Sequence, residues 1–420
     1  MLSSHLRIFG ALLASLSLLL IGVGLQNTLL GIRAGIERFS TAETGVVMSG
    51  YFFGYLAGCW AAPRTIIVAG HIRTFSLFAS LTSATAILYA VEPTVWSWLA
   101  LRFVTGASVA GLYLVVESWL NGATTSEHRG GLLGVYLIIN LGSIGVGQQL
   151  INIAPADGFI LFAVSSVLVS LAVVPVALTR TSAPAPPATP ALNLARLYRV
   201  SPVALVGTLV SGVTSGVFWG MAPTYGLLNG LDTFRIGNFM TIVVLGGMIL
   251  QWPLGRLSDR MDRRIVLIGI AGALTLVSIT MALIDPIAAR SLFLLLSFVY
   301  GGCLLTLYAI CNAHANDAAP PAAAMEVASG LLIVFALGAM SGPLVVSWAM
   351  TSFGANAYFE LTATAAFLLV VFAVARVVVK APVPSEKTGD FEPVPAGLAP
   401  PPMSSEFDSP ASQITGVECH

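Results

Sequence analysis

The sequence predicts an all-α integral membrane protein with twelve transmembrane helices in two six-helix halves. Of its 420 residues, 56% are hydrophobic and only 9% are charged, against roughly 25% charged residues in an average soluble domain. Apolar runs of about 20 residues, the length that crosses the hydrocarbon core of a bilayer, recur along the chain. A proline-rich break in the middle leaves six such runs on each side.

Polar or proline-rich breaks separate the apolar runs and give the approximate ends of each helix. The first run is longer than the core of a signal peptide and lacks a clear small-residue cleavage site, so we interpret it as the first transmembrane helix. The spans expected are 8–31, 43–62, 74–92, 95–120, 131–153 and 158–179 in the first half, and 202–227, 236–255, 264–284, 289–312, 325–350 and 357–379 in the second.

The break between the sixth and seventh spans reads RTSAPAPPATPALNLARLYR, from Arg180 to Arg199. Its prolines prevent a continuous helix, and its polarity prevents burial in lipid. We therefore expect a cytoplasmic linker at residues 181–199 between an N-terminal half, residues 1–180, and a C-terminal half, residues 200–380.

The last forty residues differ from the rest of the chain in composition. Residues 381–420 contain few large apolar side chains, and six acidic residues there oppose a single basic one, Lys387. A segment of this kind cannot bury enough apolar surface to fold alone. We expect it to be a disordered cytoplasmic tail.

The distribution of lysine and arginine predicts the orientation, because short loops rich in these residues remain cytoplasmic. With a cytoplasmic N-terminus, fourteen fall on the cytoplasmic side and four on the other, while Arg102 lies inside a span. We thus expect a multi-pass membrane protein with both termini cytoplasmic. The fourteen are Arg7, Arg64, Arg73, Arg129, Arg180, Arg196, Arg199, Arg256, Arg260, Arg263, Arg264, Arg376, Lys380 and Lys387, and the four are Arg33, Arg38, Arg235 and Arg290.

Several chemistries leave no trace in the sequence. It has no glycine-rich nucleotide-binding motif, no metalloprotease motif and no nucleophile-elbow motif. Its five histidines lack the spacing of metal ligands, and its four cysteines form no CxxC pair. We expect no enzymatic activity, no cofactor, no metal site and no nucleotide-driven pumping.

One stretch concentrates charge in this apolar chain. GRLSDRMDRR, Gly255 to Arg264, carries six charged side chains in ten residues after the eighth span. It matches the pattern GxLxDRxGRR, except that Asp262 stands where glycine is usual. With two six-span halves and a central linker, this stretch resembles the cytoplasmic loop motif of the major facilitator superfamily.

The resemblance implies a role for this loop as a latch between helices that favours the outward-facing state. A tight turn brings adjacent helices together, and a carboxylate at the rim can bridge arginines or cap a helix. The alternative is a basic anchor that only fixes topology. The latch residues are expected to be Gly255, Asp259, Arg260, Arg263 and Arg264.

The equivalent loop of the first half, GCWAAPRTIIVAGHIRTF, is degenerate, because Ala62 occupies the position of the aspartate. A symmetric pair of latches is therefore not expected. Together with the stretches RFVTGASVAGLYLVVESWLN and AHANDAAP, this departure makes the sequence resemble the YcaD-like branch of bacterial facilitators. That resemblance implies transport across the bacterial plasma (inner) membrane but no particular substrate.

Arg102 is the basic residue inside a span. It forms an RxxxG pattern with Gly106 that resembles the facilitator motif of this helix, and it lies about 10 Å from Val95 at 1.5 Å per residue. A charge at that depth should face the protein interior or a water-filled cavity. We expect Arg102 to contact an anionic substrate or to couple to proton movement; a structural tie to carbonyls or a polar partner is the alternative.

Glu117 lies about 22 Å further along the same helix, near its cytoplasmic end. The two charges are therefore too far apart to pair. We expect Glu117 to form a salt bridge at the rim with Arg73, Arg129 or another loop arginine, as part of the latch. Proton carriage is the alternative.

Polar and aromatic residues inside the spans are candidates for the lining of a cavity between the halves, where transporters built from related halves bind their substrates. Gln26 and Asn27 form the best pair, because adjacent amides in an apolar helix need partners. Each of the others could equally be a packing residue or an interfacial anchor. The candidates are Arg102, Gln26, Asn27, Asn140, Trp219, Tyr225, Gln251, Trp252 and Tyr308.

Two spans repeat glycine every four residues, in GYFFGYLAG (50–58) and GVTSGVFWG (212–220). Such a stripe of small residues lets helix backbones approach closely. Before the eleventh span, His314, Asn316 and Asp317 suggest either a helix cap with a loop hydrogen-bond network or a proton relay. Both features fit a tightly packed bundle of many helices.

These observations together predict a secondary active transporter that moves a small organic solute or amphiphile by alternating access, coupled to protons. The alternative is a transport-fold sensor or scaffold that recruits a cytoplasmic partner through its acidic tail. The expected partners are a small-molecule substrate, the lipid bilayer and protons, with no nucleic acid. A monomer is expected.

Overall fold

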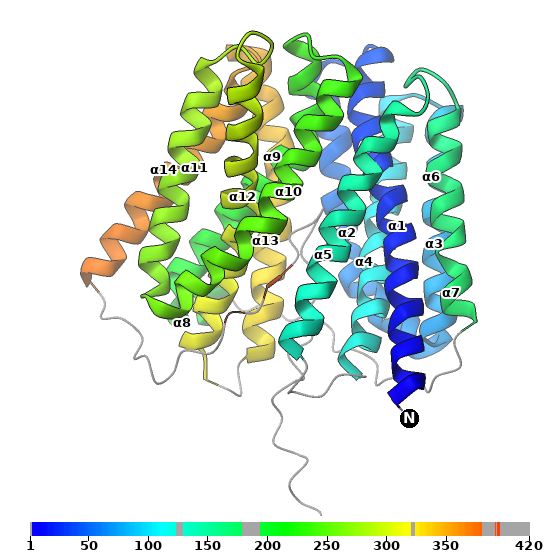
Figure 1. Cartoon of the computed structure of the whole chain (residues 1–420), viewed down its shortest axis with the longest axis horizontal. Helices are drawn as coiled ribbons and strands as arrows, with labels where there is room; N and C mark the ends of the chain where they lie inside the picture. Colours follow the sequence, from blue (N-terminus) through cyan, green and yellow to red (C-terminus); the bar gives the residue numbers. More distant parts are fainter. Residues whose placement is uncertain are drawn as a thin grey trace, which may run out of the picture.

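The computed structural model describes residues 2–122, 129–178, 194–320, 324–379, 391 and 393–394. All regular structure in this part of the chain is helical, and twelve helical segments are long and apolar enough to cross a membrane. The predicted fold class is confirmed. Figure 1 shows the helices standing side by side as one upright bundle, with the N-terminus at its lower end.

The helices follow the expected order, and the sixth span is formed by two consecutive helices, α6 and α7. The first half contains α1 (Leu2–Ile36), α2 (Thr41–Ala69), α3 (His71–Val91), α4 (Val95–Gly122), α5 (Arg129–Gln149), the short 3₁₀ helix η2 (Leu150–Asn152), α6 (Ile160–Leu171) and α7 (Val173–Ala177). The second half contains α9 (Pro202–Leu228), α10 (Thr233–Arg260), α11 (Arg263–Leu283), α12 (Arg290–Ala318), α13 (Ala324–Phe353) and α14 (Ala357–Val379).

The expected linker contains one short helix, α8 (Leu194–Val200), that precedes α9. Leu197 of α8 is buried against Val327 and Leu331 of α13, and Arg196 forms an ion pair with Glu326. The end of the linker is thus packed onto the second half. The proline-rich residues 179–193 lie outside the described part of the chain.

Helix starts follow local capping chemistry. Ser40 caps α2 in a reciprocal arrangement with Glu43, and Asp232 accepts a hydrogen bond from the Arg235 backbone N–H at the start of α10. Ser201 caps α9 directly before a proline, whose missing N–H costs nothing in the first helical turn.

Four helices extend five or more residues beyond their expected ends. α1 continues to Ile36 instead of 31, and α2 continues to Ala69 instead of 62, so the expected first-half loop is helical apart from Gly70. α10 continues to Arg260 instead of ending at 255, and α12 continues to Ala318 instead of 312. Hydropathy detects only the apolar part of a helix, whereas the hydrogen-bonded backbone continues into the polar boundary. The stretch GRLSDRMDRR is consequently not a loop as a whole: two residues, Met261 and Asp262, join the helices.

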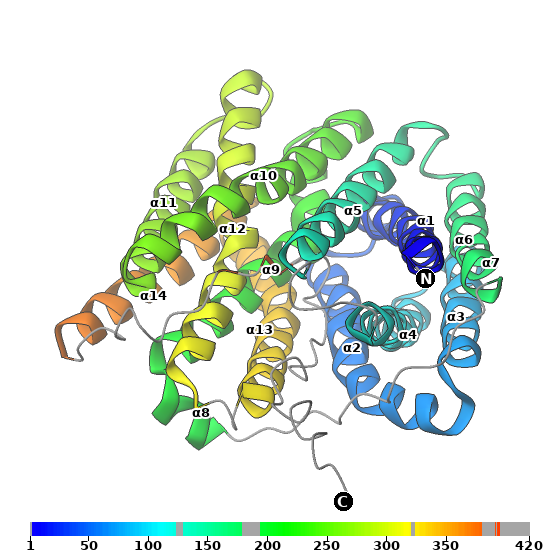
Figure 2. The same ribbon diagram turned by 60° about the horizontal axis from the view of Figure 1, so that its bottom comes forward.

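The two halves pair their helices in the same way. In the first half α1 packs on α5, α2 on α4, and α3 on α6; in the second half α9 packs on α13, α10 on α12, and α11 on α14. Figure 2 shows the two groups from the end that carries the N-terminus. Equivalent helices in chain order thus occupy equivalent positions.

Glycines make the closest of these helix contacts possible. A side chain on Gly54 would overlap the carbonyl of Phe103, and one on Gly106 would overlap the carbonyl of Tyr51, so α2 and α4 meet backbone to backbone. Gly212 and Gly216 pack in the same way on α13. The close packing predicted from the glycine repeats is confirmed.

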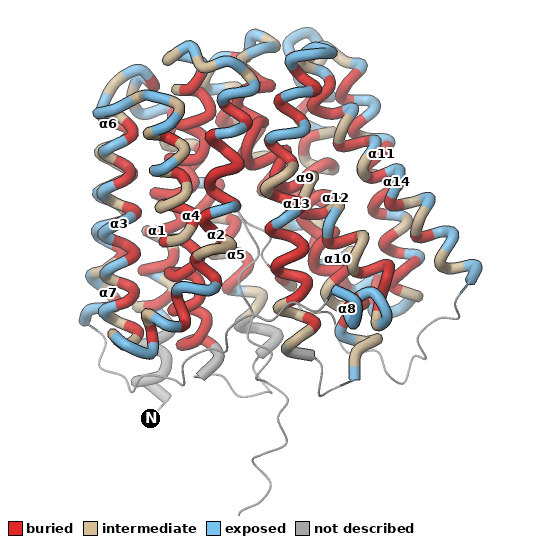
Figure 3. The backbone as a smooth tube through the Cα atoms, turned by 180° about the vertical axis from the view of Figure 1, so that it is seen from behind, coloured by how far each residue is buried: buried red, intermediate tan, exposed pale blue. Residues whose placement is uncertain are grey.

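The burial pattern is that of a bundle with an apolar outer surface. Buried residues face the interior, and exposed positions lie on the outside and at the helix ends (Figure 3). Large apolar side chains are exposed on several helices, including Phe53, Val68, Leu276 and Leu368. An outer surface of this kind suits lipid, where such side chains find an apolar environment.

The halves meet through α1 with α9, α2 with α13, and α5 with α10. We call the end of the bundle where α1 begins the N-terminal end, and the opposite one the far end. Gly31 packs on Pro223, and Gly45 packs on Ser347. Because these residues lie near the helix ends remote from the start of α1, the contacts hold the halves together toward the far end.

Candidate functional site

A buried arginine begins a chain of hydrogen bonds that crosses between the halves. Arg102 on α4 is 2% exposed, and its Nη2 lies 2.9 Å from Asn27 Oδ1 on α1, to which it donates. Asn27 Nδ2 in turn donates to the Trp219 carbonyl of α9 at 2.9 Å. Arg102 also contacts Met48 Sδ at 3.0 Å and lies 5.0 Å from the centre of the Tyr51 ring.

This arrangement leaves Arg102 with unused donor capacity. A guanidinium has five N–H donors, and the Nε of Arg102 has no hydrogen-bond partner in the described part of the chain. The ion pairs between described residues do not include Arg102. The polar tie expected as one alternative is present, and the unpaired Nε–H could also donate to an anionic group.

Glu117 lies on the same helix, inside the bundle. Glu117 is 5% exposed, and its Oε1 accepts a hydrogen bond from Tyr136 Oη on α5 at 3.0 Å. Its Oε2 has no partner among the described residues. Glu117 therefore resembles a desolvated carboxyl more than a solvated surface charge.

The expected salt bridge of Glu117 at the rim is not among the ion pairs of the described residues. α4 continues to Gly122, which keeps Glu117 within the packed part of the bundle. Arg73 is exposed on α3, and the side chain of Arg129 lies outside the described part of the structure. The neighbour that the structure gives to Glu117 is a phenol, not a guanidinium.

A second contact between the same two helices lies one turn away. Asn140 of α5 is fully buried, and its Nδ2 donates to Tyr113 Oη of α4 at 3.0 Å. Tyr113 and Glu117 are four residues apart on one helix, as are Tyr136 and Asn140 on the other, so the pairs form two rungs. The matching four-residue spacing is the sequence signal that could have identified both tyrosines, which sequence reasoning missed.

Three further cavity candidates are buried with polar atoms that have no hydrogen-bond partner among the described residues. Gln26 is 1% exposed, and neither of its amide atoms is paired. The same is true of Trp219 Nε1 and of Tyr225 Oη. Buried polar atoms of this kind require a partner, which a bound solute or water can supply.

The other aromatic candidates lie apart from Arg102 or face outward. Tyr308 on α12 packs edge-on against Phe335 at 5.1 Å between ring centres. Trp252 is 56% exposed on the outer surface, where the guanidinium of Arg256 lies 3.6 Å from its ring centre. The expectation that Trp252 lines a cavity is wrong, because its position on α10 turns it outward.

Gln251, one residue earlier on α10, faces inward and is fully buried. Its Nε2 donates to the backbone carbonyl of Val394, a residue of the C-terminal tail, at 2.8 Å. This is an intramolecular partner for a side chain expected to contact substrate, and nothing in the local sequence pattern of either segment predicts it.

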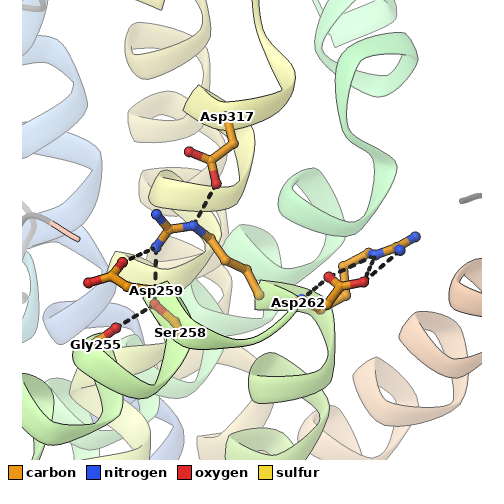
Figure 4. A network of polar contacts seen from close by, with 7 residues as sticks. Gly255, Ser258, Asp259, Asp262 and Asp317 are labelled. Carbon is orange, nitrogen blue, oxygen red and sulfur yellow. Dashed lines mark hydrogen bonds and ion pairs between the residues drawn. The ribbon is translucent and has the colours of Figure 1, made fainter. Parts of the chain in front are cut away.

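The charged motif forms a buried network at the N-terminal end of the bundle (Figure 4). Arg263 at the start of α11 pairs with Asp317 Oδ2 of α12 at 2.6 Å and with Asp259 Oδ1 of α10 at 3.3 Å. It also donates to Ser258 Oγ at 3.0 Å, and that hydroxyl donates to the Gly255 carbonyl at 2.7 Å. The network ties three helices of the second half together.

Asp317 belongs to a helix end, not to a loop before α13, because α12 continues to Ala318. Its side chain is 6% exposed and that of Arg263 is 3% exposed, so the ion pair is buried. The expectation that His314, Asn316 and Asp317 form a cap network before α13 is wrong for Asp317, which accepts a hydrogen bond from Arg263 of α11 instead.

Asp262, the residue in place of the usual glycine, caps α11. It accepts a hydrogen bond from the Arg264 backbone N–H at 2.9 Å and pairs with Arg264 Nη2 at 2.7 Å. Partial burial alone would raise the pKa of Asp262, but the hydrogen bonds and charge of Arg264 outweigh it and lower that pKa below its ordinary value. Arg260, at the end of α10, is exposed.

The sequence profile of the Major Facilitator Superfamily matches residues 7–331 and 204–412. The chain belongs to the major facilitator superfamily. The described helices of this facilitator, twelve membrane-crossing segments paired alike in two groups, agree with that assignment. It is a multi-pass transporter-family protein of the bacterial inner membrane with a small molecule as its expected cargo.

Relatives of this facilitator extend over most of its length. It is 30% identical over 370 residues to the "Uncharacterized MFS-type transporter YcaD" of Escherichia coli O157:H7, covering 87% of this chain and 95% of the relative. An uncharacterized MFS-type transporter of Enterobacter sp. (strain 638) is 28% identical over 375 residues. The YcaD-like resemblance is confirmed.

Solved transporters share its fold at low sequence identity. The nucleoside transporter NupG superposes with a TM-score of 0.73 at 12% identity, covering 89% of this chain and 98% of that one. A D-xylose-proton symporter superposes with a TM-score of 0.65 at 15% identity, covering 91% and 99%. These similarities show the fold and not the substrate.

Proposed function

We propose that this facilitator is a secondary active transporter that moves a small organic solute or amphiphile across the bacterial plasma membrane by alternating access, coupled to protons. The observation that carries the proposal is the buried chain from Arg102 through Asn27 to the Trp219 carbonyl, which links a charged candidate binding group to the contact between the halves. An anionic group on the solute is the chemistry that Arg102 would recognise.

The orientation proposed here follows the arginine distribution, with the N-terminal end in the cytoplasm. In that orientation the contacts of Gly31 with Pro223 and of Gly45 with Ser347 close the periplasmic side. This supports an assignment of the structure to an inward-facing state. Alternating access then requires these far-end contacts to separate.

Arg102 offers a way to couple binding to that separation. A carboxylate or phosphate on a solute would compete with Asn27 Oδ1 for the guanidinium, because charge-assisted hydrogen bonds are stronger than those to a neutral amide. Loss of the bond from Arg102 would free Asn27 to turn away from the Trp219 carbonyl. A solute that bound in this way would bias the two states by the difference in its interactions with them.

Glu117 is the proposed proton site. Its carboxyl is buried beside Tyr136 and Tyr113, so a negative charge there is costly unless water or a partner reaches it. Protonation removes that cost, and opening of the bundle to water restores the charge. A group whose preferred protonation state differs between two conformations links proton movement to the conformational change.

A thermal-shift screen tests the proposed binding role. Purified wild-type protein, Arg102→Ala and the exposed-site control Arg73→Ala would be heated with metabolites, organic anions and cationic drugs. We expect an organic anion to stabilise wild type and Arg73→Ala but not Arg102→Ala. Equal stabilisation of all three by every active compound would show that Arg102 does not bind the solute.

Flux measurements then separate transport from sensing. Vesicles that contain only this protein should accumulate the stabilising solute, and an imposed pH gradient should drive that accumulation. A transport-fold sensor that recruits a partner through its tail would bind the solute without moving it. Accumulation that ignores the pH gradient would remove the proton-coupling part of the proposal.

A further inference from the structure

Three residues of the C-terminal tail are placed inside the bundle. Phe391, Pro393 and Val394 lie between the two halves in both Figure 1 and Figure 2, where they appear as a short red segment near α9 and α13. Val394 is 1% exposed and belongs to the main hydrophobic core, against which Phe391 also packs. This placement differs from the position expected for a tail that extends into the cytoplasm.

Two adjacent turns of α10 hold these residues. Gln251 Nε2 donates to the Val394 carbonyl at 2.8 Å, which satisfies a main-chain acceptor inside the bundle. One turn later, the Phe391 ring lies against the backbone at Gly255, and any side chain at that position would overlap the ring. Trp252, between them in sequence, faces the outer surface, so the contact uses the inner face of α10.

The glycine of the charged motif therefore has a second role in this protein. Gly255 supplies its carbonyl to Ser258 in the latch network and, on the same turn, leaves room for an aromatic ring. Large side chains stand close to this position, with Trp252 three residues earlier and Arg256 directly after it. A glycine at 255 is what lets a ring reach the helix backbone there.

We propose that Phe391, Pro393 and Val394 act as an intramolecular plug that closes the space between the halves at the N-terminal end. This proposal rests on the proposed function, since it assigns regulation to the path that a solute would use. With the plug seated, Gln251 is occupied by the tail and the inner face of α10 is covered. The plug must leave before a solute can reach the inner face of α10 from the cytoplasm.

The length of chain between α14 and Phe391 keeps the plug close to its site on α10. Phe391 follows the end of α14 at Val379 by twelve residues, a length that reaches at most about 40 Å. Attachment through a linker of this length gives a segment an effective concentration on the order of millimolar at its site, so a contact of modest affinity is occupied most of the time. Pro393 also limits the backbone freedom that the free tail loses on seating.

Cysteine cross-linking in native membranes tests the position of the plug in the full chain. With Cys419→Ser to remove the tail thiol, the pair Gln251→Cys and Val394→Cys should be joined by a short bifunctional thiol reagent in most molecules. The control pair Trp252→Cys and Val394→Cys differs by one residue on α10 and should give at most about a tenth of that yield. Equal yields from the two pairs would overturn the plug.

Alkylation tests whether the plug blocks access. A membrane-impermeant sulfonated maleimide should modify Gln251→Cys at least fivefold faster when Phe391→Ala is added, while Phe391→Leu, which keeps an apolar side chain, should change the rate less than twofold. An unchanged rate with Phe391→Ala would overturn the blocking role. Neither readout requires a substrate, so failure here leaves the proposed transport intact, and failure of the flux measurements leaves the plug intact.

Discussion

Asn27 on α1 donates a hydrogen bond to the backbone carbonyl of Trp219 on α9 at 2.9 Å, and this bond crosses from one six-helix half to the other. The same amide accepts from the buried guanidinium of Arg102. A single side chain thus connects a buried charge to the contact between the halves.

Removal of the Asn27 side chain should weaken the contact between the two halves toward the far end. Asn27→Ala leaves Arg102 without an oxygen acceptor among its described neighbours, and we expect a loss of about 1–3 kcal/mol in the free energy of unfolding. Spin labels on α2 and α13 at the far end should report longer distances. Asn152→Ala, at an exposed residue with a local hydrogen bond, is the control and should change stability by less than about 0.5 kcal/mol.

Glu117→Gln should uncouple transport from protons. The amide oxygen can still accept from Tyr136 Oη, but the side chain no longer titrates. We expect exchange of solute across vesicle membranes to persist, while accumulation driven by a pH gradient is lost. If Glu117→Gln accumulates the solute to the same concentration ratio as the wild type under a pH gradient, Glu117 is not the proton site.

The buried ion pair between Arg263 and Asp317 should be necessary for stability. Asp317→Ala leaves the guanidinium of Arg263, 3% exposed, without its 2.6 Å partner, and we expect a loss of about 3 kcal/mol because an uncompensated buried charge is costly. Asp259 at 3.3 Å can offset part of that loss. Thermal unfolding in detergent measures the effect, with Arg260→Ala at an exposed site as the control.

Glycines at helix crossings should tolerate substitution only where space exists. A side chain on Gly246 of α10 would overlap the carbonyl of Phe298 on α12, so Gly246→Ala should destabilise the protein by about 1–3 kcal/mol. No atom lies within 4 Å of the position a side chain would take on Gly272, and Gly272→Ala should be neutral or stabilise α11. Equal melting temperatures of the two variants would contradict the backbone contact of α10 and α12.

The stabilisation supplied by Asp262 should depend on pH with a defined sign. Its pKa is lowered in the folded protein, so its contribution is fully present above the ordinary pKa of about 4 and is lost as the pH falls through the folded value. Asp262→Asn should therefore be less stable than wild type at pH 7, and the difference should shrink toward pH 3. A difference that is constant between these pH values would contradict the role of the ionised carboxylate.

The number, order and approximate ends of the transmembrane helices could be predicted because each depends on local composition. The ends of α1, α2, α10 and α12 were predicted too early, since polar residues can continue a helix once it leaves the apolar region. The charged motif was recognised from its spacing, yet its main partner, Asp317, lies 54 residues from Arg263. No local pattern specifies a partner at that separation.

In the candidate site, too, individual residues could be predicted from the sequence, whereas their partners could not. Depth in an apolar helix was enough to identify Arg102 and Asn27 as functional candidates, but not to pair them across 75 residues. Glu117 was expected beside an arginine because arginines are abundant at that end of the bundle, and its hydrogen bond to Tyr136 depends on how α4 faces α5. Tyrosines carry little weight in a search for charge, so Tyr113 and Tyr136 were overlooked.

The sequence by itself determined that this chain is a twelve-helix facilitator, because hydrophobic length, glycine spacing and the charged motif are properties of consecutive residues. The tertiary structure decided which buried polar groups meet: Arg102 with Asn27, Arg263 with Asp317, and Gln251 with the backbone of Val394. The physical reason is that burial requires each polar group to find a partner, whereas helix packing alone determines which groups come within reach.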